Sequence, residues 1–294
     1  MNGVVNIIKP AGMSSSDVVA QMRRILGQKR VGHLGTLDPA AAGVLPILVG
    51  KATRLFDYLS LHNKEYLAEF YLGAETDTLD AEGVVTERLP WDGDKERLAG
   101  VLATFTGIID QVPPQYSAVK LGGRKAYDLA RRGEAAEMPV RRVTVHRLEL
   151  MRVEDDRAWV RIECEKGTYV RSLCRDIARA VGTRGYLTYL LRTRSGGYRL
   201  EDGLTLAQAA VLAARGCLPV GRMEDAVAFL PALSVAADQE RGLRNGLRPP
   251  LKELPQHPHV RVYCGGQFFG IGHGQTGERG PELKLDLYLP PEDA

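Results

Sequence analysis

The sequence contains few cysteines, and none is placed for a common metal or redox motif. The 294 residues include four, at positions 164, 174, 217 and 264, with no Cys-x-x-Cys pair among them. Zinc sites and dithiol redox sites of the common kind use closely spaced cysteine pairs such as Cys-x-x-Cys. We therefore expect buried, reduced thiols, no bound metal, and a protein that works in a reducing cytoplasm.

Long hydrophobic runs are also absent. The best apolar stretch, Ala40–Val49, is interrupted by Gly43 and Pro46, whereas a membrane-spanning helix needs about 18 apolar residues. The N-terminal run Val4–Ile8 is short for the apolar part of a secretory signal and is soon followed by Pro10. The sequence therefore predicts a cytoplasmic protein without a membrane partner.

The overall composition is that of an ordinary folded chain. Apolar residues make up 44% and charged residues 26% of the sequence, which is enough apolar material for a packed core. There are 32 Gly and 16 Pro without a Gly-X-Y repeat, so collagen is excluded and a turn-rich protein is favoured. The net charge of +3 identifies no partner by itself.

Positive charge is nevertheless concentrated in two stretches. Residues 120–147 hold eight Lys or Arg against three acidic residues, and residues 161–199 hold nine against three. Arg suits phosphate because its planar set of N–H donors matches phosphate oxygens. Tyrosines lie in or beside these stretches, and basic side chains interleaved with aromatic ones favour a surface for a polyanion. Ordinary solvated faces carry such charges too, so this pattern alone leaves both interpretations open.

Hydrophobic periodicity predicts a mixture of helices and strands. The expected helices are Asp17–Leu26, Leu98–Phe105, Ser172–Val181 and Thr205–Ala214, and the expected strands are Glu65–Leu72, Val143–Val153 and Ala158–Cys164. The last two strands are joined by a turn at Glu154–Arg157. Gly and Pro punctuate Arg30–Val49, which we therefore expect to be mostly loop and turns.

The composition changes near residue 230. From Pro231 onward the chain has several Pro and Gly residues and short strand-like runs, which are His259–Tyr263, Gln267–Ile271 and Leu283–Tyr288. This shift predicts two domains, residues 1–230 and residues 231–294, of which the second is small and rich in strands.

The most unusual segment is Gly32–Gly43. Within it, Asp38 follows His33 by five residues and precedes Pro39, which disfavours helical backbone angles at Asp38. Glycines in the segment permit close approach of other backbone. A carboxylate fixed on such a loop can act as a nucleophile or a general base. An Asp before a Pro is also a common turn residue, so the segment alone does not decide.

Several segments, taken together and in order, carry a family resemblance. They are Lys9-Pro10-x-Gly12-x-Ser14-Ser15, Gly32–Gly43, Lys64-x-Tyr66, Leu72-Gly73-x-x-Thr76-Asp77-Thr78-x-Asp80-x-x-Gly83, Pro113-Pro114-x-Tyr116-Ser117-Ala118-x-Lys120, Lys166-Gly167-Thr168-Tyr169-Val170-Arg171-Ser172 and Leu190-Leu191-Arg192-Thr193-Arg194-Ser195-Gly196. Over residues 3–200 the chain resembles the TruB family, the bacterial tRNA pseudouridine-55 synthases. The tail, with Asn245-Gly246 and Val260–Ile271, is similar to the PUA module that ends many such enzymes, although it is shorter and departs more from the pattern.

The resemblance implies a fold, a reaction and a partner. The fold is α+β, with a mixed, mostly antiparallel sheet and flanking helices (the pseudouridine synthase fold), followed by the small PUA-like domain. The reaction is the isomerisation of uridine 55 in the T-loop of tRNA to pseudouridine, after the base has flipped out of its stack. It implies no cofactor and no metal. The implied partner is the T-arm stem-loop of tRNA, bound by a monomer, with Gly122–Arg142 closing over the RNA.

The resemblance also assigns site residues. Asp38 matches the catalytic aspartate, which would act as a carboxylate on the sugar, on the ring or on a sugar proton, and Arg171 matches the arginine that pairs with it. Tyr66 matches the aromatic residue that stacks on the target base and takes the final C5 proton. Tyr169 and Leu190 match residues that line the uracil pocket. His33 matches the histidine that helps to hold the RNA with its base extruded.

The sequence also leaves two other functions open and contains one misleading glycine motif. A non-catalytic tRNA-binding or folding protein, and an aspartate-dependent hydrolase of a small molecule, remain alternatives that the role of Asp38 would distinguish. Residues 272–277 match Gly-x-Gly-x-x-Gly, but a dinucleotide site needs a following helix and a later acidic residue. A Gly/Pro turn follows instead, so we expect no dinucleotide there.

Overall fold

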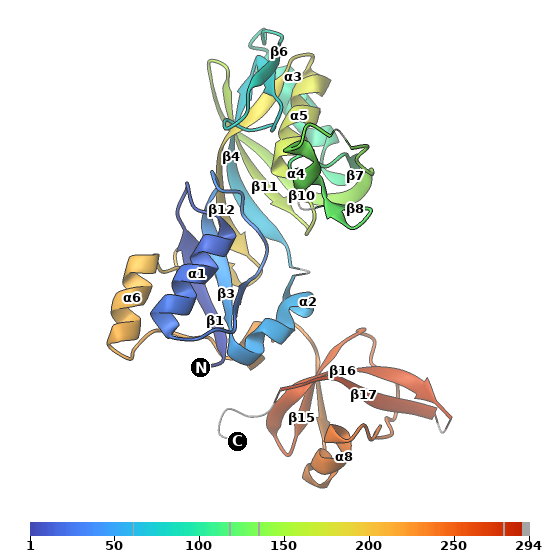
Figure 1. Ribbon diagram of the computed structural model, residues 1–294. Helices are drawn as coiled ribbons and strands as arrows, with labels where there is room; N and C mark the ends of the chain where they lie inside the picture. The colour runs from blue at the N-terminus through green and yellow to red at the C-terminus, as the bar shows by residue number, and fades with distance from the viewer. Residues whose placement is uncertain (61, 118, 135, 279, 290–294) are drawn as a thin grey trace.

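The protein consists of an elongated body built on one large sheet and a smaller strand-rich unit at the C-terminal end of the chain (Figure 1). The computed structural model describes all residues except 61, 118, 135, 279 and 290–294. Most strand pairs of the large sheet are antiparallel, and helices flank the sheet. The predicted α+β class is confirmed.

The helices and strands follow one another along the whole described chain. The helices are α1 Ser15–Leu26, α2 Phe56–Leu59, α3 Lys95–Thr104, α4 Ala126–Ala130, α5 Val170–Val181, α6 Leu206–Ala214, α7 Met223–Ala226 and α8 Glu240–Arg244, with 3-10 turns η1 Gly50–Leu55 and η2 Ala237–Gln239. The strands are β1 Gly3–Lys9, β2 Val31–His33, β3 Ala42–Val49, β4 Lys64–Leu72, β5 Ala74–Thr76, β6 Val85–Arg88, β7 Gly107–Gln111, β8 Lys120–Leu121, β9 Arg124–Lys125, β10 Arg141–Glu154, β11 Arg157–Cys164, β12 Gly185–Ser195, β13 Tyr198–Arg199, β14 Ala232–Val235, β15 Val260–Cys264, β16 Gln267–Gly277 and β17 Gly280–Tyr288.

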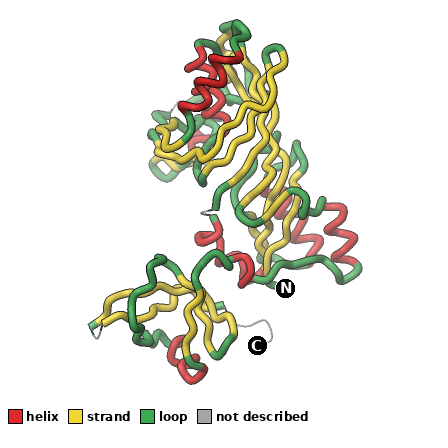
Figure 2. Tube along the Cα trace, turned by 180° about the vertical axis from the view of Figure 1, so that it is seen from behind, coloured by secondary structure: helices red, strands yellow, loops and turns green. Residues whose placement is uncertain are grey.

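The large sheet runs through the whole body (Figure 2). Its main path is β1-β3-β12-β4-β11-β10-β7, with β2 and β13 paired beside it. The contact of β12 with β3 is parallel and joins Leu191 and Arg192 to Ala42 and Gly43. This short parallel contact places the C-terminal part of β12 next to the chain that leads out of the Asp38 loop.

Helices cover the two ends of this sheet. On α5, apolar side chains at helical spacing, from Val170 through Leu173 and Ile177 to Val181, pack with β4 and β11 in one core cluster. Gly182 ends α5 in a left-handed conformation (φ 90°) that favours glycine. A second cluster joins α1 and α6 to β1 and β3. The side chain of Arg171 therefore extends from the first turn of a firmly packed helix.

The expectation that Arg30–Val49 is mostly loop is wrong. It contains β2 and the eight-residue β3, whose apolar residues are almost all buried. Pro46 stands inside β3, where a proline normally argues against a strand. Its carbonyl accepts a hydrogen bond from Leu34 N at 2.9 Å, one residue beyond the end of β2. The missing N–H of Pro46 faces the same side, so it falls where the pairing with β2 ends and before the pairing with β12 at Ala42 and Gly43.

The other predicted elements are present, most with shifts of one to three residues at their ends, while β16 extends six residues beyond the predicted Ile271. Ser14 and Thr205 cap α1 and α6 through capping boxes, so these helices begin where their caps are. Helix α5 begins at Val170, two residues earlier than expected. The predicted hairpin is β10–β11, with Asp155 at φ 49° in its turn. Cys164, Cys174 and Cys264 are buried free thiols, and Cys217 is an exposed one.

The C-terminal unit is a four-stranded sheet in the order β14-β15-β16-β17. Its first strand begins at Ala232, close to the predicted boundary at residues 230/231. Ile271 and Leu287 pack with Leu48 and Leu55 of the large body in one apolar cluster. The Gly-x-Gly-x-x-Gly segment 272–277 lies within β16, an antiparallel strand, and not at a strand-to-helix turn.

The basic segment 122–142 carries the end of the small β8–β9 hairpin and helix α4. Ala126 of α4 packs with Val119 and Met138, and Tyr169 contacts this cluster. Its predicted closure over RNA remains a prediction. In the part of the chain that the structure describes, no helix is long and apolar enough to cross a membrane.

Candidate active site

Asp38 lies on the loop between β2 and β3, and two neighbouring side chains hold this loop in place. The hydroxyl of Ser15 donates to Leu37 O at 3.0 Å and accepts from Leu37 N at 2.9 Å. On the other side of Asp38, Nζ of Lys9 donates to Pro39 O at 3.1 Å and also to two carbonyls of residues 10–13. The backbone on both sides of Asp38 is therefore fixed.

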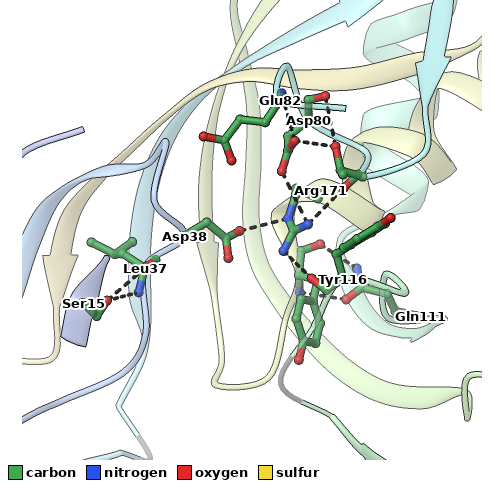
Figure 3. A network of polar contacts seen from close by, with 10 residues as sticks. Ser15, Leu37, Asp38, Asp80, Glu82, Gln111, Tyr116 and Arg171 are labelled. Carbon is green, nitrogen blue, oxygen red and sulfur yellow. Dashed lines mark hydrogen bonds and ion pairs between the residues drawn. The ribbon is translucent and has the colours of Figure 1, made fainter. Parts of the chain in front are cut away.

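Asp38 reaches across the site to Arg171 at the start of α5 (Figure 3). Its Oδ2 lies 2.9 Å from Nε of Arg171. The contact is an ion pair and not an aligned hydrogen bond, since the Nε–H finds no acceptor at good angles. The Asp38 side chain is 40% exposed and that of Arg171 is 6% exposed. A buried cation thus holds a carboxylate that solvent or a substrate can reach.

Arg171 is itself held by three further groups. Nη1 donates to Thr78 O and Nη2 to Tyr116 O, both at 3.0 Å, and Nη1 lies 3.5 Å from Oδ2 of Asp80. The other oxygen of Asp80 accepts from the hydroxyl of Thr78 at 2.6 Å and from the N–H of Glu82 at 3.1 Å. The guanidinium plane is therefore fixed from several directions before any ligand arrives.

A cleft of about 360 Å³ opens beside this pair. Asp38, Arg171, Tyr66, Tyr169 and Leu190 all line it. These five predicted site residues come from four separate parts of the fold, namely the β2–β3 loop, β4, β12 and the start of α5. The structure brings them together as the resemblance implied, while their roles remain predictions.

Tyr66 lies on the cleft-facing side of β4. Its phenol is almost fully buried, and the positive charge of Arg192 lies nearby. Burial raises the pKa of Tyr66 to about 12, and the charge of Arg192 offsets only part of this effect. The Tyr66 side chain is therefore neutral over the physiological pH range.

Tyr169 precedes α5, and its backbone is fixed by Gln111. The side-chain amide of Gln111 accepts from Tyr169 N at 2.8 Å and donates to Tyr169 O at 3.1 Å. Gln111 is buried at the end of the edge strand β7. These paired bonds fix where the Tyr169 ring enters the cleft.

The sixth predicted residue, His33, stands apart from the other five. It ends β2 and does not line the cleft, although Gly35, two residues later, does. Burial and the nearby charge of Arg192 lower the pKa of His33. Its Nδ1 is buried without a hydrogen-bond partner among the described residues. His33 is therefore a neutral side chain next to the site.

Sequence reasoning assigned no role to several residues that build the site. Arg192, Lys64 and Lys9 occur in the motifs quoted above, so their presence there was a usable signal. Gln111 belongs to no such motif, and nothing in its sequence context indicates contact with Tyr169. Within the described ranges, no three or more His, Cys, Asp or Glu side chains are grouped to hold a metal ion.

Comparison with known proteins identifies the family. Residues 23–170 match the model of the TruB family pseudouridylate synthase N-terminal domain. The chain is 42% identical over 297 residues to tRNA pseudouridine synthase B of Moorella thermoacetica, with 96% of each chain covered. It is 46% identical over 256 residues to the protein of the same name from Thermobifida fusca, covering 84% of this chain and 86% of that one.

The fold comparison agrees. A solved structure of a Cbf5–Nop10–Gar1 complex contains a chain that matches with a TM-score of 0.74 and 26% sequence identity, covering 99% of this chain and 86% of the other. The match extends over the strand-rich C-terminal unit, consistent with the expected PUA-like domain. Sequence, fold and the arrangement of the cleft agree, and the chain belongs to the TruB family of pseudouridylate synthases.

Proposed function

We propose that this protein isomerises uridine 55 in the T-loop of tRNA to pseudouridine, with Asp38 as the catalytic carboxylate. The observation that carries the proposal is the Asp38–Arg171 pair at 2.9 Å beside a cleft lined by Tyr66, Tyr169 and Leu190. The relatives named tRNA pseudouridine synthase B support tRNA as the substrate. The motifs quoted above support the choice of uridine 55.

The reaction needs few protein groups. The N1–C1′ bond breaks, the uracil turns, C5 bonds to C1′, and the C5 proton is lost while N1 gains a proton. Asp38 acts on C1′, on the ring or on a sugar proton, and each of these roles requires an ionised carboxylate that the nucleotide can reach. Arg171 supplies a fixed positive charge, while partial exposure keeps Asp38 accessible.

The cleft supplies the remaining functions. The ring of Tyr66 offers a stacking surface for the flipped base, which is worth about 1–3 kcal/mol per base. Tyr169 and Leu190 form other parts of the cleft lining and would enclose the uracil. His33 beside the Asp38 loop would contact the RNA from which the base was extruded. The basic segments 120–147 and 161–199 and the PUA-like unit would bind phosphates and RNA shape.

The direct test is to incubate the protein with unmodified tRNA and with an isolated T-arm stem-loop, and to map pseudouridine at single-nucleotide resolution. We expect one modified position, uridine 55, in both RNAs, and no reaction with free uridine or UMP. Turnover of UMP would favour a small-molecule enzyme instead. Tight tRNA binding without any modified position would favour the non-catalytic tRNA-binding alternative.

A second prediction concerns Arg171. We expect Arg171→Lys to lower kcat about 10- to 100-fold, because one ammonium group cannot reach Asp38, Thr78 O and Tyr116 O together, and a misplacement of about 1 Å can cost about 100-fold. Single-turnover kinetics on the stem-loop measure this effect. The matched control is Arg215→Lys, an exposed arginine at the end of α6. Wild-type kcat in Arg171→Lys would remove the positioning role.

A further inference from the structure

Two buried cations of the cleft have no acidic partner among the residues that the structure describes. Arg192 is 1% exposed and Lys64 is 7% exposed, and both line the cleft. Among the described residues, no carboxylate lies within ion-pair distance of either, and the same holds for Lys166 on the cleft wall. The carboxylates of the cleft are engaged elsewhere, since Asp38 pairs with Arg171 and Glu165 lies 3.5 Å from His146.

All the partners that these two cations do have are neutral. Arg192 donates from Nε to Val44 O at 2.7 Å and from Nη2 to Gly35 O at 3.1 Å, with a longer contact from Nη1 to Thr36 O. Lys64 donates to the carbonyls of Ser60 and His62. An arginine has five N–H donors and a lysine three, so each retains at least one.

Buried cations without anions are costly, since desolvation is not repaid by an opposite charge. Burial and the charge of Arg192 lower the pKa of Lys64 to about 8, the direction expected when a cation lacks a counterion. A buried cation without a counterion at the wall of an open cleft can therefore bind an anion that enters the cleft.

Gly35 leaves space between the two cations. A Cβ built on it would stand 3.6 Å from Nη1 of Arg192 and 4.0 Å from Cε of Lys64. Gly35 has φ 80°, which disfavours any side chain there, and it lines the cleft. Both cations are nearly buried, and because residue 35 has no side chain, none stands between them and the cleft that they line.

We propose that Lys64 and Arg192, with Lys166 at the rim, form a subsite for one phosphodiester group of the RNA next to the flipped uridine. A phosphodiester carries one full negative charge and two free oxygens, one for each cation. The subsite adjoins Tyr66, the stacking surface for the base, so a flipped nucleotide brings its own backbone to it. This assignment rests on the proposed function, since it takes RNA as the substrate.

The experiment uses T-arm stem-loops in which one phosphate, either 5′ or 3′ of the target uridine, is replaced by an uncharged methylphosphonate. For the wild-type protein we expect one of the two replacements to weaken the Kd or kcat/KM about 10- to 100-fold, as for the loss of a charged hydrogen bond. A methylphosphonate in the distal stem is the RNA control.

The protein arm uses Lys64→Met, which keeps the length of the side chain and removes its charge. Replacing a buried cation with an apolar side chain is compatible with folding, and circular dichroism checks this. For Lys64→Met, the methylphosphonate that weakens the wild type should weaken the Kd or kcat/KM by less than about threefold, because the contact with that phosphate is already lost. The slope of log Kd against log salt should fall by about 0.7. Lys95→Met, an exposed residue of α3, is the matched control.

The outcomes separate this subsite from the function on which it rests. Two results would overturn the phosphate assignment even if pseudouridine forms. One is that the methylphosphonate weakens the Kd or kcat/KM equally for wild type and Lys64→Met, and the other is that neither methylphosphonate weakens them for the wild type. If wild type formed no pseudouridine, the proposed function would fail, while the Kd measurements would still decide whether Lys64 recognises that phosphate.

Discussion

Asp38→Asn should lower the rate of pseudouridine formation about 1000-fold or more. The amide has the same shape but carries no charge, so it cannot serve as nucleophile or base, functions worth roughly 10²–10⁴-fold or more. Single-turnover assays with the T-arm stem-loop measure the rate. Binding of the RNA, measured by fluorescence anisotropy, should remain within about threefold of wild type, since the variant removes a negative charge near a polyanion.

The fold should tolerate Asp38→Asn. The Asp38 side chain is 40% exposed, so the amide of the variant can be hydrated. Arg171 keeps its hydrogen bonds to the carbonyls of Thr78 and Tyr116. We expect the free energy of unfolding to change by about 1 kcal/mol at most. Asp202→Asn, an exposed residue in a turn, is the matched control. Unfolding of Asp38→Asn, or a rate close to wild type, would contradict the catalytic role.

Elements with an uninterrupted periodic pattern could be predicted from the sequence. Helix α1 shows a clear apolar stripe behind the cap Ser14, and the β10–β11 hairpin shows alternation around a polar turn. Strand β12 was not predicted, and its register explains why. Irregularities between Leu187 and Tyr189 and between Arg192 and Arg194 shift the alternation twice, so no single period runs along it. Strand β3 was missed for a different reason, because Gly43 and Pro46 are typical of loops although they stand in a buried strand.

The site was harder to predict than the elements. Asp38 and Arg171 are far apart in sequence, and no periodicity links a loop to a helix start, so only the motif resemblance paired them. Burial of Arg192 depends on strands β3 and β12 meeting in parallel, a tertiary contact. The bonds of Gln111 to Tyr169 also arise only once β7 and α5 are packed together.

Tyr66→Phe tests whether the phenol moves a proton or only stacks. Since burial raises the pKa of Tyr66 to about 12, its hydroxyl is protonated at neutral pH and can take the C5 proton only if its own proton passes to solvent in the cleft in the same step. The positive charge of Arg192 near the phenol would stabilise negative charge that develops on its oxygen during this exchange. The wild-type pH–rate profile should accordingly show no Tyr66 ionisation between pH 6 and 10.

We expect Tyr66→Phe to lower kcat about 100-fold, within the range for loss of a proton-transfer group, and to leave KM within about threefold, because the ring still stacks. With uridine deuterated at C5, the variant should show a primary isotope effect that the wild type lacks, since loss of the C5 proton becomes the slow step. Tyr186→Phe, on β12 away from the cleft, is the matched control. An unchanged kcat without an isotope effect would leave Tyr66 as a stacking surface alone, and the C5 proton would then pass directly to water or to Asp38.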